Sequence, residues 1–173
     1  SLFYEGKRVG DLLLSTVYLP LSENEHQFDM HFFRDAEEFV QSSLYYRDGK
    51  QDSIMGNLSV TEMPLEMLNP FIPGGMAELK GKLLGEISVD GTTGNPDIQG
   101  YLQMDSANMF VEMANTTVRF DSKEIGIYDK KIWFNKYKLF ASGENPFVIN
   151  GAVDFSDMSN MTADLKLNAR NMQ

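Results

Sequence analysis

Apolar and polar residues alternate one by one along most of this chain, and this two-residue period is typical of β-strands. Each alternating run ends in a group of Gly, Asn, Asp or Pro residues, which favour turns. The strands that this pattern predicts cover residues 9–21, 28–33, 39–46, 54–60, 83–89, 98–104, 109–113, 116–120, 125–128, 132–134, 139–142, 147–155 and 163–169.

One segment breaks the alternation. Pro64 stands where a first helical residue would be, and the apolar residues after it follow a helical spacing. Pro70 and Pro73 limit the helix to about two turns. We therefore expect a short helix over residues 64–72. It either caps an apolar trough or is a crossover that covers a sheet edge. The residues that would enter the trough are Leu65, Leu68, Phe71 and Ile72.

About a dozen short strands and one helix predict an all-β fold. We expect a long curved sheet, antiparallel or mixed, that either folds lengthwise like a taco around an open apolar groove or closes into a sandwich. The alternation suits both forms. The expected sections are a meander over residues 1–62, the helix and a Gly/Pro linker over 63–75, and a β-rich repeat over 76–173, all in one continuous domain.

The inward positions of the predicted strands are the main functional candidates. A trough for acyl chains needs a continuous apolar face, because a charged group facing lipid tails is costly. Eleven methionines also suit a surface that adapts to varied tails. The groove candidates are Leu83, Ile87, Val89, Ile98, Leu102, Met104, Phe147, Ile149, Val153, Leu165 and Leu167.

Composition excludes several other functions. A net charge of −10, from 15 basic and 25 acidic residues, argues against nucleic acid as a partner. There is no cysteine, and His26 and His31 are the only histidines, so no zinc site or catalytic triad is visible. No apolar run approaches the ~20 residues of a membrane helix. We expect no enzyme activity, no metal and no cofactor, and we interpret the glycines as bulges and bends: Gly81, Gly85, Gly91 and Gly100.

Four segments follow one another in a fixed order. They are the proline-bounded helix at 64–71, the glycine-rich strand at 79–92, the Asn-Pro segment at 95–102 and the strand at 147–153. In this order the chain resembles the TamB/AsmA-like family of envelope proteins, closest to its TamB branch. The resemblance covers roughly the last two thirds of the chain.

The resemblance implies a β-rich body in the periplasm of a Gram-negative bacterium, with an inner-membrane anchor outside this chain. It also implies an apolar groove that binds or conducts phospholipid or other acyl chains between the membranes. A further implied role is support of outer-membrane protein assembly through a barrel partner of the Omp85 type.

A second interpretation remains open. The chain could be a non-enzymatic β-sandwich that binds glycan or protein at a cell surface. That interpretation predicts a sealed core and a platform of exposed aromatic residues on one outer face, formed by Tyr45, Tyr46, Trp133 and Tyr137. A third, weaker alternative is a carbohydrate-active enzyme on a β-helix, which would need a pair of carboxylates across a cleft.

Overall fold

The computed structural model describes residues 2–4, 7–72, 76–141, 145–157 and 159–169. The chain is all-β, as the alternation predicts, and most of its described residues lie in strands. The strands are β1 (Leu2–Tyr4), β2 (Lys7–Gly10), β3 (Leu12–Pro20), β4 (Glu25–Arg34), β5 (Glu37–Arg47), β6 (Ser53–Pro64), β7 (Ala77–Thr92), β8 (Asn95–Val111), β9 (Thr116–Phe120), β10 (Ile125–Tyr128), β11 (Lys131–Phe140), β12 (Phe147–Asp154) and β13 (Thr162–Ala169). Two short 3₁₀ helices are η1 (Leu65–Phe71) and η2 (Glu112–Ala114).

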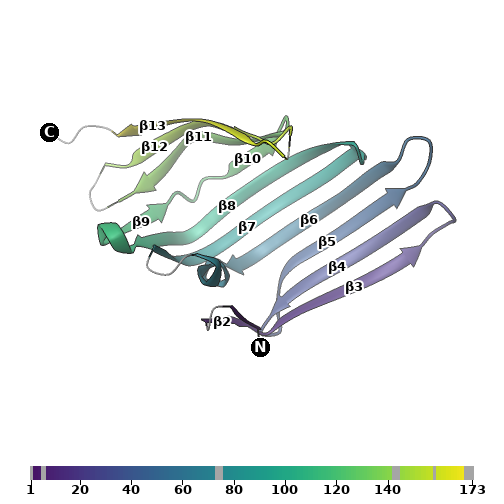
Figure 1. The fold of residues 1–173 in the computed structure, drawn as a ribbon, viewed down its shortest axis with the longest axis horizontal. Helices are drawn as coiled ribbons and strands as arrows, with labels where there is room; N and C mark the ends of the chain where they lie inside the picture. Colours follow the sequence, from purple (N-terminus) through teal and green to yellow (C-terminus); the bar gives the residue numbers. More distant parts are fainter. Residues whose placement is uncertain (1, 5–6, 73–75, 142–144, 158, 170–173) are drawn as a thin grey trace.

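Strands β3 to β13 form one 11-stranded sheet in the order β13-β12-β11-β10-β8-β7-β6-β5-β4-β3, with β9 beside β8 and β11. Every pair of neighbouring strands is antiparallel, so the option of a mixed sheet is wrong. Figure 1 shows these strands side by side in a single layer, and β1 and β2 pair only with each other. The closed-sandwich alternative is therefore wrong for the described chain.

Strands β9 and β10 occupy one strand position between β8 and β11. Asn108 of β8 pairs with Arg119 of β9, and Leu102 of β8 pairs with Ile125 of β10. Six residues separate the two positions on each side of the pairing (108 − 102 and 125 − 119), so β10 continues along β8 in the same register as β9. Asp121 bridges the gap, because its backbone N–H donates to the Lys138 carbonyl at 3.0 Å. The two elements are thus a single interrupted strand.

Short connections between successive strands produce this meander. The β4–β5 and β10–β11 loops have two residues each, and all four of these residues have positive φ: Asp35, Ala36, Asp129 and Lys130. Both loops therefore have the backbone sign that two-residue type I′ hairpins require. The sequence places a long loop at residues 90–97, but β7 and β8 extend into it, and only Thr93 and Gly94 connect them.

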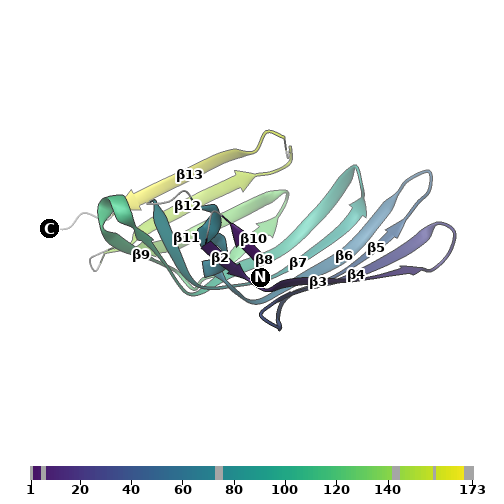
Figure 2. The same cartoon turned by 60° about the horizontal axis from the view of Figure 1, so that its bottom comes forward.

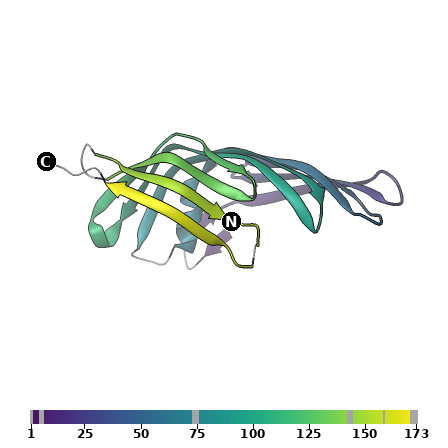
Figure 3. The same cartoon turned by 90° about the horizontal axis from the view of Figure 1, so that it is seen from above.

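Bulges bend the long strands. Glu62 in β6, Ser106 in β8 and Lys136 in β11 have φ near +50° (53°, 50° and 52°), and each lies where the pairing register shifts by one residue. Gly81 faces the β8 bulge with φ +108°, where an added Cβ would stand 2.5 Å from the Ala107 Cα. A bulge increases local twist and bends its strand. The sheet is accordingly arched when it is seen from above (Figure 3).

Segment η1 continues the path of β6 along the edge of β7, at the lower margin of the sheet in Figure 1. Strand β6 ends at Pro64, opposite Lys82, so the β7 backbone before Lys82 lacks a strand partner on that side. The Asn69 carboxamide takes this place by donating to the Leu79 carbonyl at 2.8 Å and accepting from the Leu79 N–H at 2.7 Å. The predicted helix is therefore a 3₁₀ helix that covers a sheet edge.

Candidate functional site

The pairing register sorts the side chains of the large sheet onto two faces. Directly paired residues in an antiparallel sheet point to the same side, and alternate residues along a strand do likewise. One row across the middle of the sheet pairs Leu58 with Ile87, Ile87 with Gly100, Gly100 with Ile127, and Ile127 with Ile132. Ile132 then pairs with Val153. We call the side that carries this row the apolar face.

Positions on the apolar face carry no charge over the central strands. The β7 positions are Ala77, Leu79, Gly81, Leu83, Gly85, Ile87, Val89 and Gly91. The β8 positions are Pro96, Ile98, Gly100, Leu102 and Met104, and after the bulge Ala107, Met109 and Val111. The β10 and β12 positions are Ile125, Ile127, Phe147, Ile149, Gly151 and Val153.

All eleven predicted groove residues lie on this one face. Leu83, Ile87 and Val89 pair directly with Met104, Gly100 and Ile98. At the β13 end of the same face, Gly151 pairs with Leu165 and Ile149 pairs with Leu167. The sequence prediction grouped these residues strand by strand, and the register joins them into one surface. Their binding of lipid stays a prediction.

Exposure of the apolar face rises from the middle of the sheet to its two ends. Ile127 is 6% exposed and Tyr137 is 2% exposed, whereas Leu14 on β3 is 53% exposed and Leu167 on β13 is 61% exposed. No second large sheet lies over the described strands, so the central side chains are buried by neighbours on the same face and by adjoining segments such as η1, which contacts β7. That burial requires a face that curves inward, in agreement with the arch in Figures 2 and 3. The apolar face is thus most buried at the middle of the sheet and most exposed at its two ends, and we call this curved apolar surface the trough.

Tyr137 carries a deeply buried hydroxyl group on the apolar face. Its ring packs edge-on against Phe134, with ring centres 6.0 Å apart, and its hydroxyl donates to the Asp121 carbonyl at 2.8 Å. Burial, and to a lesser extent the nearby Asp121 carboxylate, raise the pKa of Tyr137 to about 12. The phenol is thus neutral at any physiological pH, which suits an uncharged surface.

The opposite face is polar and is held by cross-strand hydrogen bonds. The Ser43 hydroxyl donates to the Asp29 carboxylate at 2.7 Å, and the Ser59 hydroxyl donates to Glu86 at 2.7 Å. The Ser43 bond, followed by a bond from Gln27, lowers the pKa of Asp29. Asp29 and Glu86 are thus charged groups of the polar face that have hydrogen-bond partners on that face.

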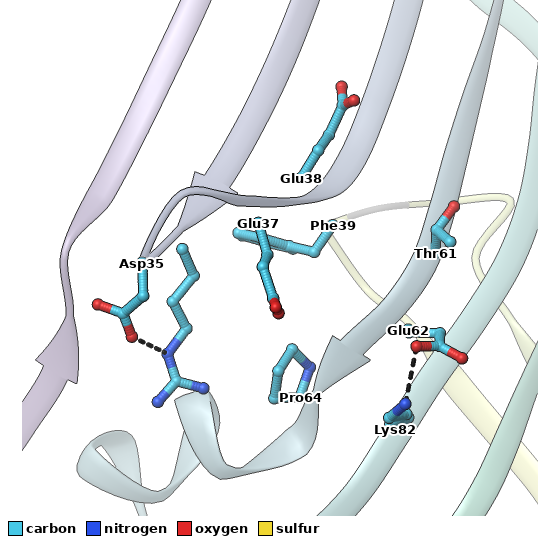
Figure 4. A pocket seen from close by; sticks show the side chains of 9 residues that line it. Asp35, Glu37, Glu38, Phe39, Thr61, Glu62, Pro64 and Lys82 are labelled. Atoms are coloured by element: carbon cyan, nitrogen blue, oxygen red, sulfur yellow. Dashed lines mark hydrogen bonds and ion pairs between the residues drawn. The ribbon is translucent and has the colours of Figure 1, made fainter.

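A charged hollow of about 360 Å³ lies at the rim, where β5, β6 and η1 meet (Figure 4). Its two cations already have partners: Arg34 Nε lies 3.6 Å from Asp35 Oδ2, and Lys82 Nζ lies 2.7 Å from Glu62 Oε2. Phe39 lines the hollow and is buried, and its ring centre lies 6.4 Å from that of Phe32 on the apolar face. The hollow is lined by Arg34, Asp35, Glu37, Glu38, Phe39, Thr61, Glu62, Pro64 and Lys82.

The predicted capping residues of η1 have different surroundings. Leu65 is 3% exposed, whereas Leu68 and Phe71 are 39% and 57% exposed, and Ile72 is half-buried just after the last turn. The residues of η1 that are buried are Leu65, Met67 and Pro70. Whether the exposed pair closes the trough stays a prediction.

The four aromatic residues of the second interpretation do not form one platform. Tyr137 is buried on the apolar face, and Tyr46 lies on the same face, where it stacks with His26 at 6.1 Å between ring centres. Tyr45 alternates with Tyr46 and therefore lies on the polar face, and so does Trp133, which alternates with Ile132. The prediction of a single aromatic face is wrong.

Several residues of the trough were missed from the sequence: Ile125 and Ile127 lie in a predicted strand, whereas Tyr137 falls between the predicted strands 132–134 and 139–142. Ile125, Ile127 and Tyr137 are among the most buried side chains of the described chain. They lie in short segments on either side of the β9–β10 gap and the β11 bulge, where the alternation is too brief to show a face. The pairing of Ile125 with Leu102 places Ile125 and Ile127 on the apolar face, and the pairing of Tyr137 with Ile149 places Tyr137 there.

No group of three or more His, Cys, Asp or Glu side chains that could hold a metal ion occurs among the described residues. No helix of the described chain is long and apolar enough to cross a membrane. Comparison with protein-family models, with curated proteins and with solved structures finds no match. The fold and the trough define a class, a single-layer antiparallel sheet with an inward-curving apolar face that is uncharged from β7 to β13.

Proposed function

We propose that this chain is a non-enzymatic scaffold that holds the acyl chains of phospholipid against its apolar face. One observation carries the proposal: the face is uncharged from β7 to β13, and no second large sheet covers the described strands. Large exposed apolar surfaces on folded proteins mark binding sites. Each methylene that leaves water contributes about 0.8 kcal/mol.

The dimensions and the rim also suit lipid. Ten strand positions at ~4.8 Å spacing span about 45 Å, more than the ~30 Å of a bilayer's hydrocarbon core. The apolar rows run across the strands along this length, so that an extended acyl chain can lie along a row. The rim hollow beside the apolar face is lined by acidic and basic side chains, a polar setting in which a lipid headgroup can lie.

The resemblance to TamB/AsmA-like proteins extends this proposal. In that setting the chain is part of a larger protein in the periplasm of a Gram-negative bacterium, anchored in the inner membrane. Its trough conducts phospholipid between the two membranes and supports outer-membrane protein assembly with a barrel partner.

The test is extraction of the purified chain with organic solvent, followed by mass spectrometry of the released lipid. We expect phospholipid in near-stoichiometric amounts. The Ile87→Asp and Ile149→Asp variants should lose it, because each places a carboxylate on the apolar face. Ser88→Asp is the matched control: Ser88 follows Ile87 in β7 and is exposed on the polar face.

Melting curves of the variants separate loss of lipid from loss of fold. Both Ile87 and Ile149 are only half-buried, so the variants should still show a cooperative transition. A lipid-free wild-type chain, or Asp variants that bind as much lipid as wild type, would overturn the assignment of the apolar face to lipid.

A further inference from the structure

Strand β3 is the outermost strand at one end of the sheet, and both of its faces are apolar. Residues 12–21 contain no charged side chain, although nearly a quarter of the whole chain is charged. The apolar side chains of this stretch are between 42% and 60% exposed: Leu12, Leu13, Leu14, Val17, Tyr18, Leu19 and Leu21.

The polar-face side of β3 is unlike the rest of that face. Leu13, Val17 and Leu19 pair with Phe33, Asp29 and Gln27 of β4, and from β4 inward the face is largely polar. The opposite end of the sheet differs too, because β13 carries Asp164 and Lys166 on its polar face. Charges on an edge strand oppose pairing with a further strand, and β3 has none. Exposure to lipid does not explain leucines on the polar face.

The outer backbone of β3 is also available for pairing. Within the described chain, β4 is the only strand paired with β3, and Figure 1 shows no strand beyond it. Backbone N–H and C=O groups on that side can therefore accept another extended strand, in the manner of strand addition.

We propose that β3 pairs antiparallel with β3 of a second copy of this chain. A two-fold axis at Thr16 is the register in which all nine residues of β3 are paired, and it keeps each face continuous across the junction. In this register Leu13 lies opposite Leu19, and Leu14 lies opposite Tyr18. Pairs of this kind stabilise antiparallel strands.

The absence of charge on β3 lowers the electrostatic cost of pairing two copies at this edge. Two chains of net charge −10 repel one another over most of their surfaces, and the uncharged β3 edge is where they approach at least electrostatic cost. The pairing buries the leucines of both faces and joins the two apolar faces into one surface.

Sedimentation over a range of concentrations tests the proposal. Wild type should dimerise reversibly. The Leu19→Lys variant should have a dimer dissociation constant that is about tenfold higher or more, so it should sediment as a monomer at concentrations where wild type is a dimer. Met55→Lys is the matched control, because Met55 lies in the same row of the polar face as Leu19 but on the interior strand β6. The two side chains are similarly exposed, at 42% and 55%.

Cross-linking tests the register. The chain has no cysteine, so a single Thr16→Cys substitution places two thiols opposite each other at the axis, within the reach of a disulfide. Two Leu12→Cys thiols would lie eight residues apart, about 27 Å at a rise of ~3.4 Å per residue. Oxidation should yield a covalent dimer for the first variant and a monomer for the second.

Three results would overturn the proposal: a monomeric wild type at every concentration, a Leu19→Lys dimer as tight as wild type, or equal cross-linking at residues 12 and 16. Leu19 lies outside the apolar face, so lipid extraction from Leu19→Lys should be unchanged. The lipid proposal and the dimer proposal can therefore fail separately.

Discussion

The side chain of Asn69 pairs with the backbone of Leu79 as a strand residue would, with one hydrogen bond of 2.8 Å to the carbonyl and one of 2.7 Å from the N–H. This double bond fastens η1 to the part of β7 that β6 does not reach. Both residues are half-buried, so water replaces these bonds poorly if they are lost.

We therefore expect Asn69→Leu to lower the free energy of unfolding by about 2 kcal/mol or more, since two backbone groups lose their partners. Asn69→Asp keeps the acceptor and loses the donor, and should fall between wild type and Asn69→Leu. Urea titration of the three chains measures the difference. Equal midpoints for all three would show that the pair does not hold η1 in place.

The depth of the trough gives a second prediction. Ile127 is 6% exposed and Leu167 is 61% exposed, although both lie on the apolar face. Ile127→Ala should cost about 2–5 kcal/mol, in the range of core truncations, whereas Leu167→Ala should cost less than about 1 kcal/mol. Both values come from denaturant unfolding of lipid-free protein. Similar costs at the two positions would contradict an inward-curving face.

The raised pKa of Tyr137 predicts that the folded chain loses stability at alkaline pH. The folded chain holds the phenol proton up to a pKa of about 12, and the unfolded chain releases it near pH 10.0. Its contribution to stability is therefore complete below pH 10 and is lost as the pH rises from about 10 to about 12.

The variant Tyr137→Phe should remove this part of the pH dependence, at the cost of the hydrogen bond to Asp121, about 1 kcal/mol. Thermal melts of both chains at pH 9 and pH 11 measure it. The midpoint of wild type should fall further between these pH values than that of the variant. Parallel decreases would show that the phenol has an ordinary pKa in the fold.

Alternation along the chain predicts the strands well, and the places where it fails have a physical cause. The sequence pattern divides β8 into residues 98–104 and 109–113, and β11 into residues 132–134 and 139–142. Each division falls at a bulge, Ser106 in β8 and Lys136 in β11. A bulge adds one residue and shifts the phase of the alternation, so a continuous strand resembles two separate ones.

The site was predicted as a set of residues but not as a shape. Alternation shows which side chains share a face within a strand, and this is enough to select all eleven groove candidates. It cannot show whether a second sheet covers that face, because a sandwich core has the same period. The contribution of Asn69 was also hidden, since a polar residue inside a short apolar helix gives no sign of its backbone partner.

An uncharged trough has a consequence for how this chain changes over evolutionary time. A surface that excludes charge, and makes no specific contact, accepts Leu, Val or Met where Ile87 now stands. Positions such as Gly81, where a Cβ would meet the Ala107 backbone, accept far fewer substitutions. Descendants of this sequence should therefore lose residue identity quickly while they keep the spacing of glycines, bulges and apolar positions. Evolutionary relationships among such sheets are better traced by this spacing than by sequence identity.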